Sequence, residues 1–193
     1  MHARRPPSRR IVPSGETGRR VPDFDVLDQS DAWDPASAAT VYERLRLQPD
    51  LRFFTTTEEA CAGALLDLLL AQDGPPQHPK VPVLQMVDAR LAENRTDGWR
   101  HRDMPEDGDA WRATLRGLDE DADDQHTAPF AACTAERQRS LVQAVPDLQG
   151  DDWHGMPAGH VWSLWTRYAC TAFYAHPWTG RPAITGASQP VIT

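Results

Sequence analysis

Apolar residues recur at intervals of three and four along much of the chain, which is the spacing of one face of an α-helix. The clearest stretch runs to Ala71 and ends at the turn-forming residues 72–76. Thr56 and Glu59 fit a capping box, in which the hydroxyl accepts a free backbone N–H and the glutamate reaches back. The apolar stripe of this expected helix contains Ala60, Cys61, Ala64, Leu65, Leu68 and Leu69.

The same spacing predicts helices in the rest of the chain, whereas no run alternates apolar and polar residues as a strand would. Asp34 before Pro35 is typical of a helix start. The acidic run 119–124 is expected to be the solvated end of a helix. The fold class is therefore all-α, an irregular orthogonal bundle of about five helices with a long extended N-terminal arm. Besides the helix ending at Ala71, the expected ranges are 35–47, 82–91, 109–120, a helix from about 134, and 159–175.

Composition divides the chain into three parts: a basic, largely disordered arm (1–50) containing the short helix, a helical domain (51–180) and a flexible tail (181–193). The first twenty residues hold six arginines and one acid, although the whole chain carries a net charge of −8. The acidic body argues against nucleic acid as a partner. No apolar run reaches the roughly 20 residues of a membrane span. Because no apolar stretch of a secretory signal follows the arginines, a cytoplasmic location is expected, with export or membrane association alongside a partner as the alternative.

Sequence motifs that would indicate catalysis or a cofactor are absent from the chain. There is no glycine-rich phosphate loop, no Gly-x-Ser-x-Gly, no Cys-x-x-Cys and no His-x-x-x-His. Cys61, Cys133 and Cys170 are interpreted as small buried residues in a reducing compartment, with a Cys61–Cys170 disulfide as the alternative. We therefore expect no catalytic, cofactor-binding or metal-binding residue in this chain.

The last predicted helix and the residues after it are rich in aromatic side chains. Trp165, Tyr168, Ala169 and Ala172 are expected to pack in the core. The remaining aromatic residues cannot all face one way on a helix about 10 Å across, and tryptophan and tyrosine are enriched at interface hot spots. The predicted partner-binding residues are Trp162, Phe173, Tyr174, His176 and Trp178.

Four motifs in a fixed order suggest a family. Phe53-Phe54-Thr55 leads into Glu58-Glu59, 87–91 matches an "IDxxL" helix, Phe130 precedes Gln138, Leu141 and Val142, and 173–177 matches "FYxxP". In this order, over about residues 51–180, the chain resembles the family of gluconate 2-dehydrogenase subunit 3, the small subunit of flavin-dependent sugar dehydrogenases. It departs from the family in lacking a recognised twin-arginine signal and a "GFxGP" stretch after 177.

The resemblance implies a non-catalytic accessory subunit that binds and stabilises a larger subunit, or assists its maturation. That partner would be a glucose–methanol–choline type dehydrogenase that holds FAD and oxidises the sugar. A cytochrome c subunit, with its haem, is a further candidate partner. This chain itself would bind no cofactor.

Two other functions remain open from the residues alone. One is a metal-binding or enzymatic helical protein that uses His176 together with His154 and His160. The other is a homo-oligomeric scaffold without a different partner.

Overall fold

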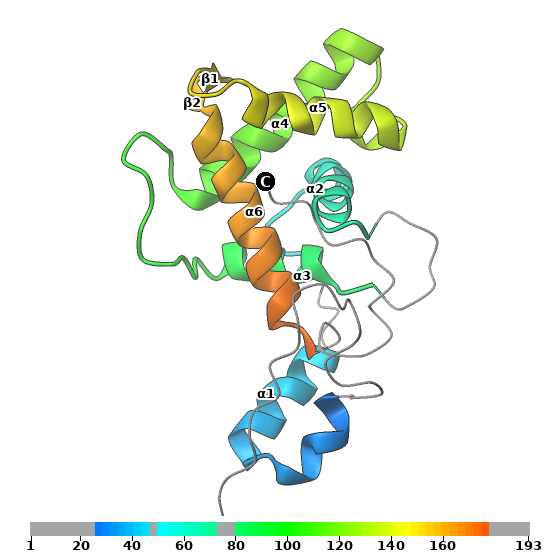
Figure 1. Ribbon diagram of the computed structural model, residues 1–193, viewed down its shortest axis with the longest axis vertical. Coiled ribbons are helices and arrows are strands. Elements are labelled where there is room, and N and C mark those ends of the chain that lie inside the picture. Colours follow the sequence, from blue (N-terminus) through cyan, green and yellow to red (C-terminus); the bar gives the residue numbers. More distant parts are fainter. Residues whose placement is uncertain (1–25, 47–49, 73–79, 178–193) are drawn as a thin grey trace, which may run out of the picture.

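The computed structural model describes residues 26–46, 50–72 and 80–177, which form a mostly helical domain (Figure 1). The all-α class is therefore confirmed. The elements in chain order are the 3₁₀ helix η1 (Val26–Ala32), α1 (Pro35–Arg46), α2 (Thr56–Leu69), α3 (Val83–Ala92), α4 (Asp107–His126), the 3₁₀ helix η2 (Phe130–Ala132), α5 (Ala135–Asp147), β1 (Asp152–Trp153), β2 (Met156–Pro157) and α6 (Ala158–Ala175). Within the described ranges, no helix is both long and apolar enough to cross a membrane.

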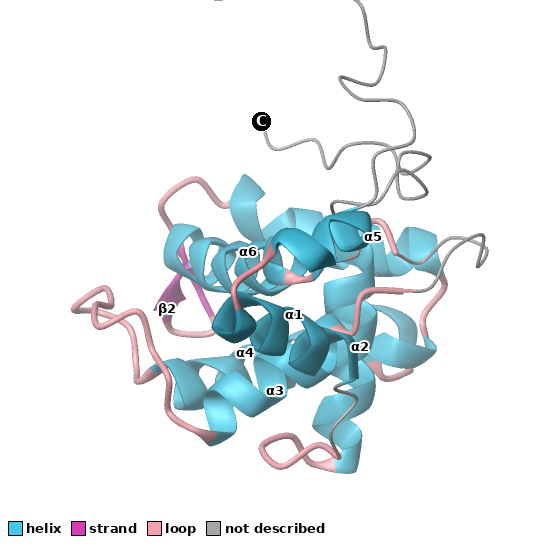
Figure 2. Cartoon of the chain, turned by 90° about the horizontal axis from the view of Figure 1, so that it is seen from below, coloured by secondary structure: helices cyan, strands magenta, loops and turns pink. Residues whose placement is uncertain are grey.

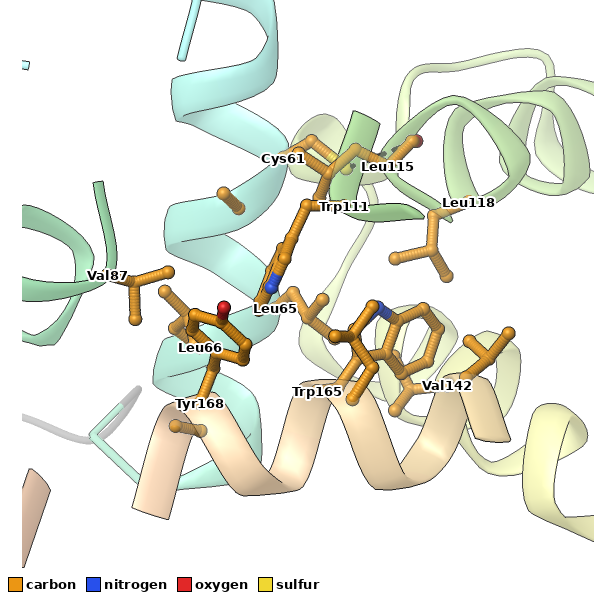
Figure 3. Close-up of a cluster of buried hydrophobic side chains, with 14 of the residues drawn as sticks. Cys61, Leu65, Leu66, Val87, Trp111, Leu115, Leu118, Val142, Trp165 and Tyr168 are labelled. Atoms are coloured by element: carbon orange, nitrogen blue, oxygen red, sulfur yellow. Dashed lines mark hydrogen bonds between the residues drawn. The ribbon is translucent and has the colours of Figure 1, made fainter. Parts of the chain in front are cut away.

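The hydrophobic core lies where α6 packs against α2, α4 and α5, and Figure 3 shows its largest side chains. Trp111 and Tyr168 meet edge to face, with ring centroids 5.8 Å apart. The indole Nε1 of Trp165 donates to Thr114 Oγ1 at 3.0 Å, so this polar group is satisfied inside the core. The prediction that Trp165, Tyr168, Ala169 and Ala172 pack in the core is confirmed.

Helix α2 begins one residue earlier than the capping-box prediction. Thr55, not Thr56, is the N-cap: its N–H donates to Glu58 Oε2 at 2.8 Å and its Oγ1 accepts from the Glu58 N–H at 3.4 Å. Thr-x-x-Glu occurs twice in overlapping positions, so local spacing alone allows both registers. Arg112 of α4 selects the first register, because its guanidinium pairs with Glu58 at 2.6 Å.

Helix α4 runs from Asp107 to His126, whereas the sequence predicted an end near 120. The acidic run 119–124 is therefore helical, not a helix end. Its carboxylates have partners: Asp119 accepts the Phe130 N–H at 2.9 Å, and Asp121 accepts the Trp153 indole N–H at 2.8 Å. These tertiary hydrogen bonds offset the low helix propensity of aspartate.

A short antiparallel hairpin of β1 and β2 precedes α6. Its turn residues His154 and Gly155 have φ values of 48° and 75°, as a two-residue hairpin turn requires. The hairpin packs on Gly117, where an added Cβ would lie 2.8 Å from the Trp153 ring. Strands of two residues are too short to be recognised from alternation in the sequence.

Helix α1 projects from one end of the bundle (Figure 1), so in the view from below it lies in front of the other helices (Figure 2). Its predicted start is confirmed, because Asp34 Oδ1 accepts the N–H groups of Ala36 and Ser37 at 3.0 and 3.1 Å. None of its described side chains is buried. Two hydrogen bonds join α1 to the end of α6: Arg44 Nη1 donates to the Ala175 carbonyl at 2.8 Å, and His176 Nε2 donates to the Arg44 carbonyl at 3.2 Å.

Candidate functional site: the outward face of α6

Helix α6 has one face in the core and an opposite face toward solvent. The buried side is formed by residues at helical spacing that include Val161, Trp165 and Tyr168. The opposite side, which we name the outward face, consists of Trp162, Ser163, Thr166, Cys170, Phe173 and Tyr174, all half-buried or exposed.

The outward face contains no charged residue. Beyond His160, the single charged residue of α6 is Arg167, at the margin of this face, and it is paired with Asp97 and, at 3.2 Å, with Asp107. Surface helices ordinarily carry charged residues on the side away from the core. An uncharged strip about the length of a helix is therefore a candidate docking surface.

Two aromatic rings lie at the C-terminal end of the outward face. The Tyr174 side chain is the most exposed large apolar group of the described residues, at 63%. The Phe173 ring packs against it edge to face, with centroids 5.3 Å apart. At the other end, Trp162 is partly buried against the core. Rings that are held by such packing lose little side-chain entropy when they bind.

The structure places the five predicted partner-binding residues differently. Trp162, Phe173 and Tyr174 share the outward face, and partner binding by them stays a prediction. His176 is 2% exposed and does not lie on this face, because the chain leaves the helix after Ala175 and the ring turns toward Arg44. Burial lowers the pKa of His176, although its hydrogen bond to the Arg44 carbonyl acts in the opposite direction. Trp178 lies outside the described residues.

The three histidines of the metal-binding alternative do not form one site. His154 pairs with Asp121 at 2.8 Å and with Glu120 at 3.3 Å, beside the hairpin. His160 is in the first turn of α6 and His176 follows its last residue, so the two lie about 24 Å apart along a helix that rises 1.5 Å per residue. The structure thus rules out a centre built from His154, His160 and His176 together.

The aspartate of the "IDxxL" motif has a structural role that the sequence did not reveal. Asp88 is 1% exposed, and its carboxylate accepts the backbone N–H groups of Arg52, Phe53 and Phe54 at 2.7, 2.9 and 2.9 Å. These bonds fasten the segment before α2 to α3. We therefore expect the aspartate of the motif to contribute to the folding of the domain.

A second buried carboxylate, Asp107, lies at the start of α4 and joins this helix to α6. Asp107 accepts the phenolic O–H of Tyr168 at 2.7 Å and also pairs with Arg167. Burial, together with the hydrogen bond to Asp107, raises the pKa of Tyr168. Arg90 lies over the Tyr168 ring at 4.8 Å and pairs with Asp97. Because every member has a partner, this network is a structural one.

A groove of about 470 Å³ separates α1 from α3 and α6. Its wall contains Arg44 of α1, Met86 and Arg90 of α3, and Thr171 and Ala172 of α6. The volume falls within the range of small-ligand pockets, and the lining mixes apolar groups with charged groups of both signs. The groove uses a different side of α6 from the outward face.

The surroundings of Cys61 and Cys170 do not favour an activated thiolate. All three cysteines are free thiols, so the Cys61–Cys170 disulfide alternative is wrong. Burial raises the pKa of Cys61 and, to a smaller extent, that of Cys170.

The described residues form an all-α domain with an uncharged outward face on α6. A family model described as gluconate 2-dehydrogenase subunit 3 matches residues 56–186, which is more than half of the chain. The chain belongs to this family, and the resemblance inferred from its motifs is confirmed. No curated protein and no solved structure shows significant similarity to it.

Proposed function

We propose that this chain is a non-catalytic accessory subunit that binds an FAD-dependent dehydrogenase subunit through the outward face of α6. Family membership supports a place in a gluconate dehydrogenase complex. The observation that carries the choice of surface is the uncharged strip with exposed Tyr174 at one end and Trp162 at the other. A hydrophobic centre of this kind is typical of protein interfaces.

Binding would stabilise the partner by mass action, because the outward face recognises the folded flavoprotein and not its unfolded chain. When this chain is present at one hundred times the Kd of the complex, its partner would gain about 2.7 kcal/mol of stability. FAD on the large subunit would carry out the oxidation of the sugar, and a haem subunit is the proposed electron acceptor. This chain would supply no group to the redox step, and it would share the compartment of its partner.

Helix α1 supports a second contact with the partner. It has an ordinary N-cap, but it buries none of its described side chains and touches the bundle through the end of α6. A helix of 12 residues is marginal without tertiary packing. We propose that the arm becomes ordered on the partner's surface, in addition to the outward face.

The experiment that tests the proposal places a charge on the outward face. Co-expression of the chain with a candidate FAD-dependent large subunit is followed by affinity purification of the flavoprotein. Tyr174→Glu is expected to abolish co-purification, because a carboxylate would be desolvated in the interface. Trp99→Glu is the matched control, since Trp99 is also exposed, at 52%, but lies on the connector.

Circular dichroism of both variants shows whether they keep the helical fold. Retained co-purification of folded Tyr174→Glu would overturn the proposed surface. Light scattering of the free chain tests the homo-oligomer alternative. A dimer that Tyr174→Glu dissociates, without any co-purifying flavoprotein, would favour the scaffold.

A further inference from the structure

A cluster of metal-ligating side chains lies at the start of α6, apart from the outward face. His160 Nδ1 lies 3.0 Å from Asp103 Oδ1, and the His101 ring stacks on the His160 ring with centroids 3.6 Å apart. One ligand atom from each of the three residues lies within 4.8 Å of the other two. No other group of this kind occurs among residues 26–46, 50–72 and 80–177.

The three donors come from two elements that the fold brings together. His101 and Asp103 belong to the connector between α3 and α4, and His160 belongs to the first turn of α6. The side chain of Asp103 is 53% exposed and that of His160 is 32% exposed, so a hydrated ion can reach both. The nearby cation Arg167 is held by Asp97 and Asp107 and by the face of Trp99. Its charge is therefore balanced locally.

We propose that His101, Asp103 and His160 bind a divalent first-row transition ion, for which Zn²⁺ is the probe. Two imidazole nitrogens and one carboxylate oxygen are a donor set that suits Zn²⁺, with water in the remaining position. Mg²⁺ and Ca²⁺ are hard cations that prefer oxygen ligands, so this set discriminates against them. Zn²⁺ is redox-inert, and its role here is to fasten the connector to α6.

Ligation requires one rearrangement of the cluster. The two rings are nearly parallel, with planes 8° apart, whereas a bound ion lies in the plane of each imidazole that ligates it. One ring must therefore rotate out of the stack. His101 is the ring that moves, because it sits on the connector, where its second aromatic neighbour is the exposed Trp99 at 5.4 Å. Two metal–nitrogen bonds replace one stacking contact.

The spacing of the three ligands in the sequence does not reveal this site. His101 and Asp103 are two residues apart, but His160 follows Asp103 by 57 positions, so no compact ligand motif exists. The inference goes beyond the proposed function, because it concerns binding by this chain alone.

The test is calorimetric titration of the EDTA-treated, untagged chain with Zn²⁺ at about pH 7.5. One equivalent is expected to bind. Each of His101→Gln, Asp103→Asn and His160→Gln is expected to weaken binding at least about tenfold. Mg²⁺ at the same concentration is expected to give no heat of binding.

His126→Gln is the matched control, because it also removes one histidine but lies in the last turn of α4. It is expected to bind Zn²⁺ as the unchanged chain does. Zn²⁺ is also expected to raise the melting temperature of the unchanged chain and not that of His160→Gln. Absence of stoichiometric binding, or binding that survives both histidine substitutions, would overturn the site.

Discussion

Helices α6 and α1 meet at His176, but they differ in what holds them in place. On α6, Val161 and Trp165 are fully buried and Tyr168 is 1% exposed. On α1, the capping of Asp34 and the proline at the first helical position favour the helix locally, while no described side chain is buried. The position of α6 is therefore set by burial of its side chains. Helix α1 is instead stabilised by its N-cap and first-turn proline and by the two hydrogen bonds to the end of α6.

The comparison shows that regular helical sequence does not imply a share in the stability of the domain. Helices in proteins gain most of their stability from packing an apolar face. We expect the bundle from α2 to α6 to unfold as one cooperative unit, and α1 to open before it.

The largest effect is expected from Trp165→Ala, which should lower the free energy of unfolding by roughly 3–5 kcal/mol. The substitution leaves a cavity and removes the partner of Thr114 Oγ1. Tyr42→Ala on α1 is the counterpart, and because Tyr42 is 44% exposed it should change stability by at most about 0.5 kcal/mol. Urea unfolding followed by circular dichroism measures both. Equal losses would show that α1 belongs to the cooperative unit.

A somewhat smaller loss is expected when the Asp88 carboxylate is removed. Asp88→Ala leaves three backbone N–H groups without their acceptor, at a cost of roughly 3 kcal/mol. Asp88→Asn keeps one acceptor oxygen and should lie between this variant and the unchanged chain. The same urea experiment ranks the three proteins. A loss below about 1 kcal/mol for Asp88→Ala would contradict the role assigned to the motif.

The two helix caps extend the comparison at a smaller scale. Thr55→Ala should cost about 1 kcal/mol of global stability, because Thr55 caps a helix of the bundle. Thr56→Ala should cost clearly less, since Thr56 is the first residue inside α2. Asp34→Ala should reduce helical ellipticity without moving the urea midpoint. A shifted midpoint for Asp34→Ala would place α1 in the same unfolding unit as α2.

The smallest effect concerns pH and the contact between α1 and α6. Burial lowers the pKa of His176 in the folded chain. The stabilisation that neutral His176 gives to the contact between α1 and α6 is therefore complete above the ordinary histidine pKa of about 6.5, and it is lost as pH falls through the lowered pKa. Amide exchange of residues 35–46, corrected for its intrinsic pH dependence, should become faster at about pH 5.5 than at about pH 7.5. His176→Gln, which does not titrate, should remove this difference.

Much of the fold follows from hydrophobic periodicity, because the buried stripes of α2, α3, α5 and α6 lie at helical spacing. The prediction errors occur where residues distant in the sequence determine the local structure. Arg112 selects Thr55 over Thr56 as the cap of α2, and the partners of Asp119 and Asp121 keep the acidic run of α4 helical. The local sequence pattern does not indicate such tertiary partners.

The candidate site was predictable in part. The sequence predicted that Trp162, Phe173, Tyr174 and Trp178 cannot all face one way, whereas the structure places the first three together on the outward face, with Trp162 and Phe173 also packed against the core. The burial of His176 was not predictable, because it depends on Arg44 of a helix 132 residues earlier in the chain. The cluster at His160 was missed for the same reason.

The placement of the cysteines makes the outward face chemically addressable. Cys61 and Cys133 are buried, whereas Cys170 is partly exposed near the middle of the strip. Burial raises the pKa of the Cys170 thiol, so a thiol-reactive fluorophore should attach to it slowly, yet in preference to the two buried cysteines and without any engineered cysteine. Its emission would then report directly on whatever covers that helix in the assembled complex.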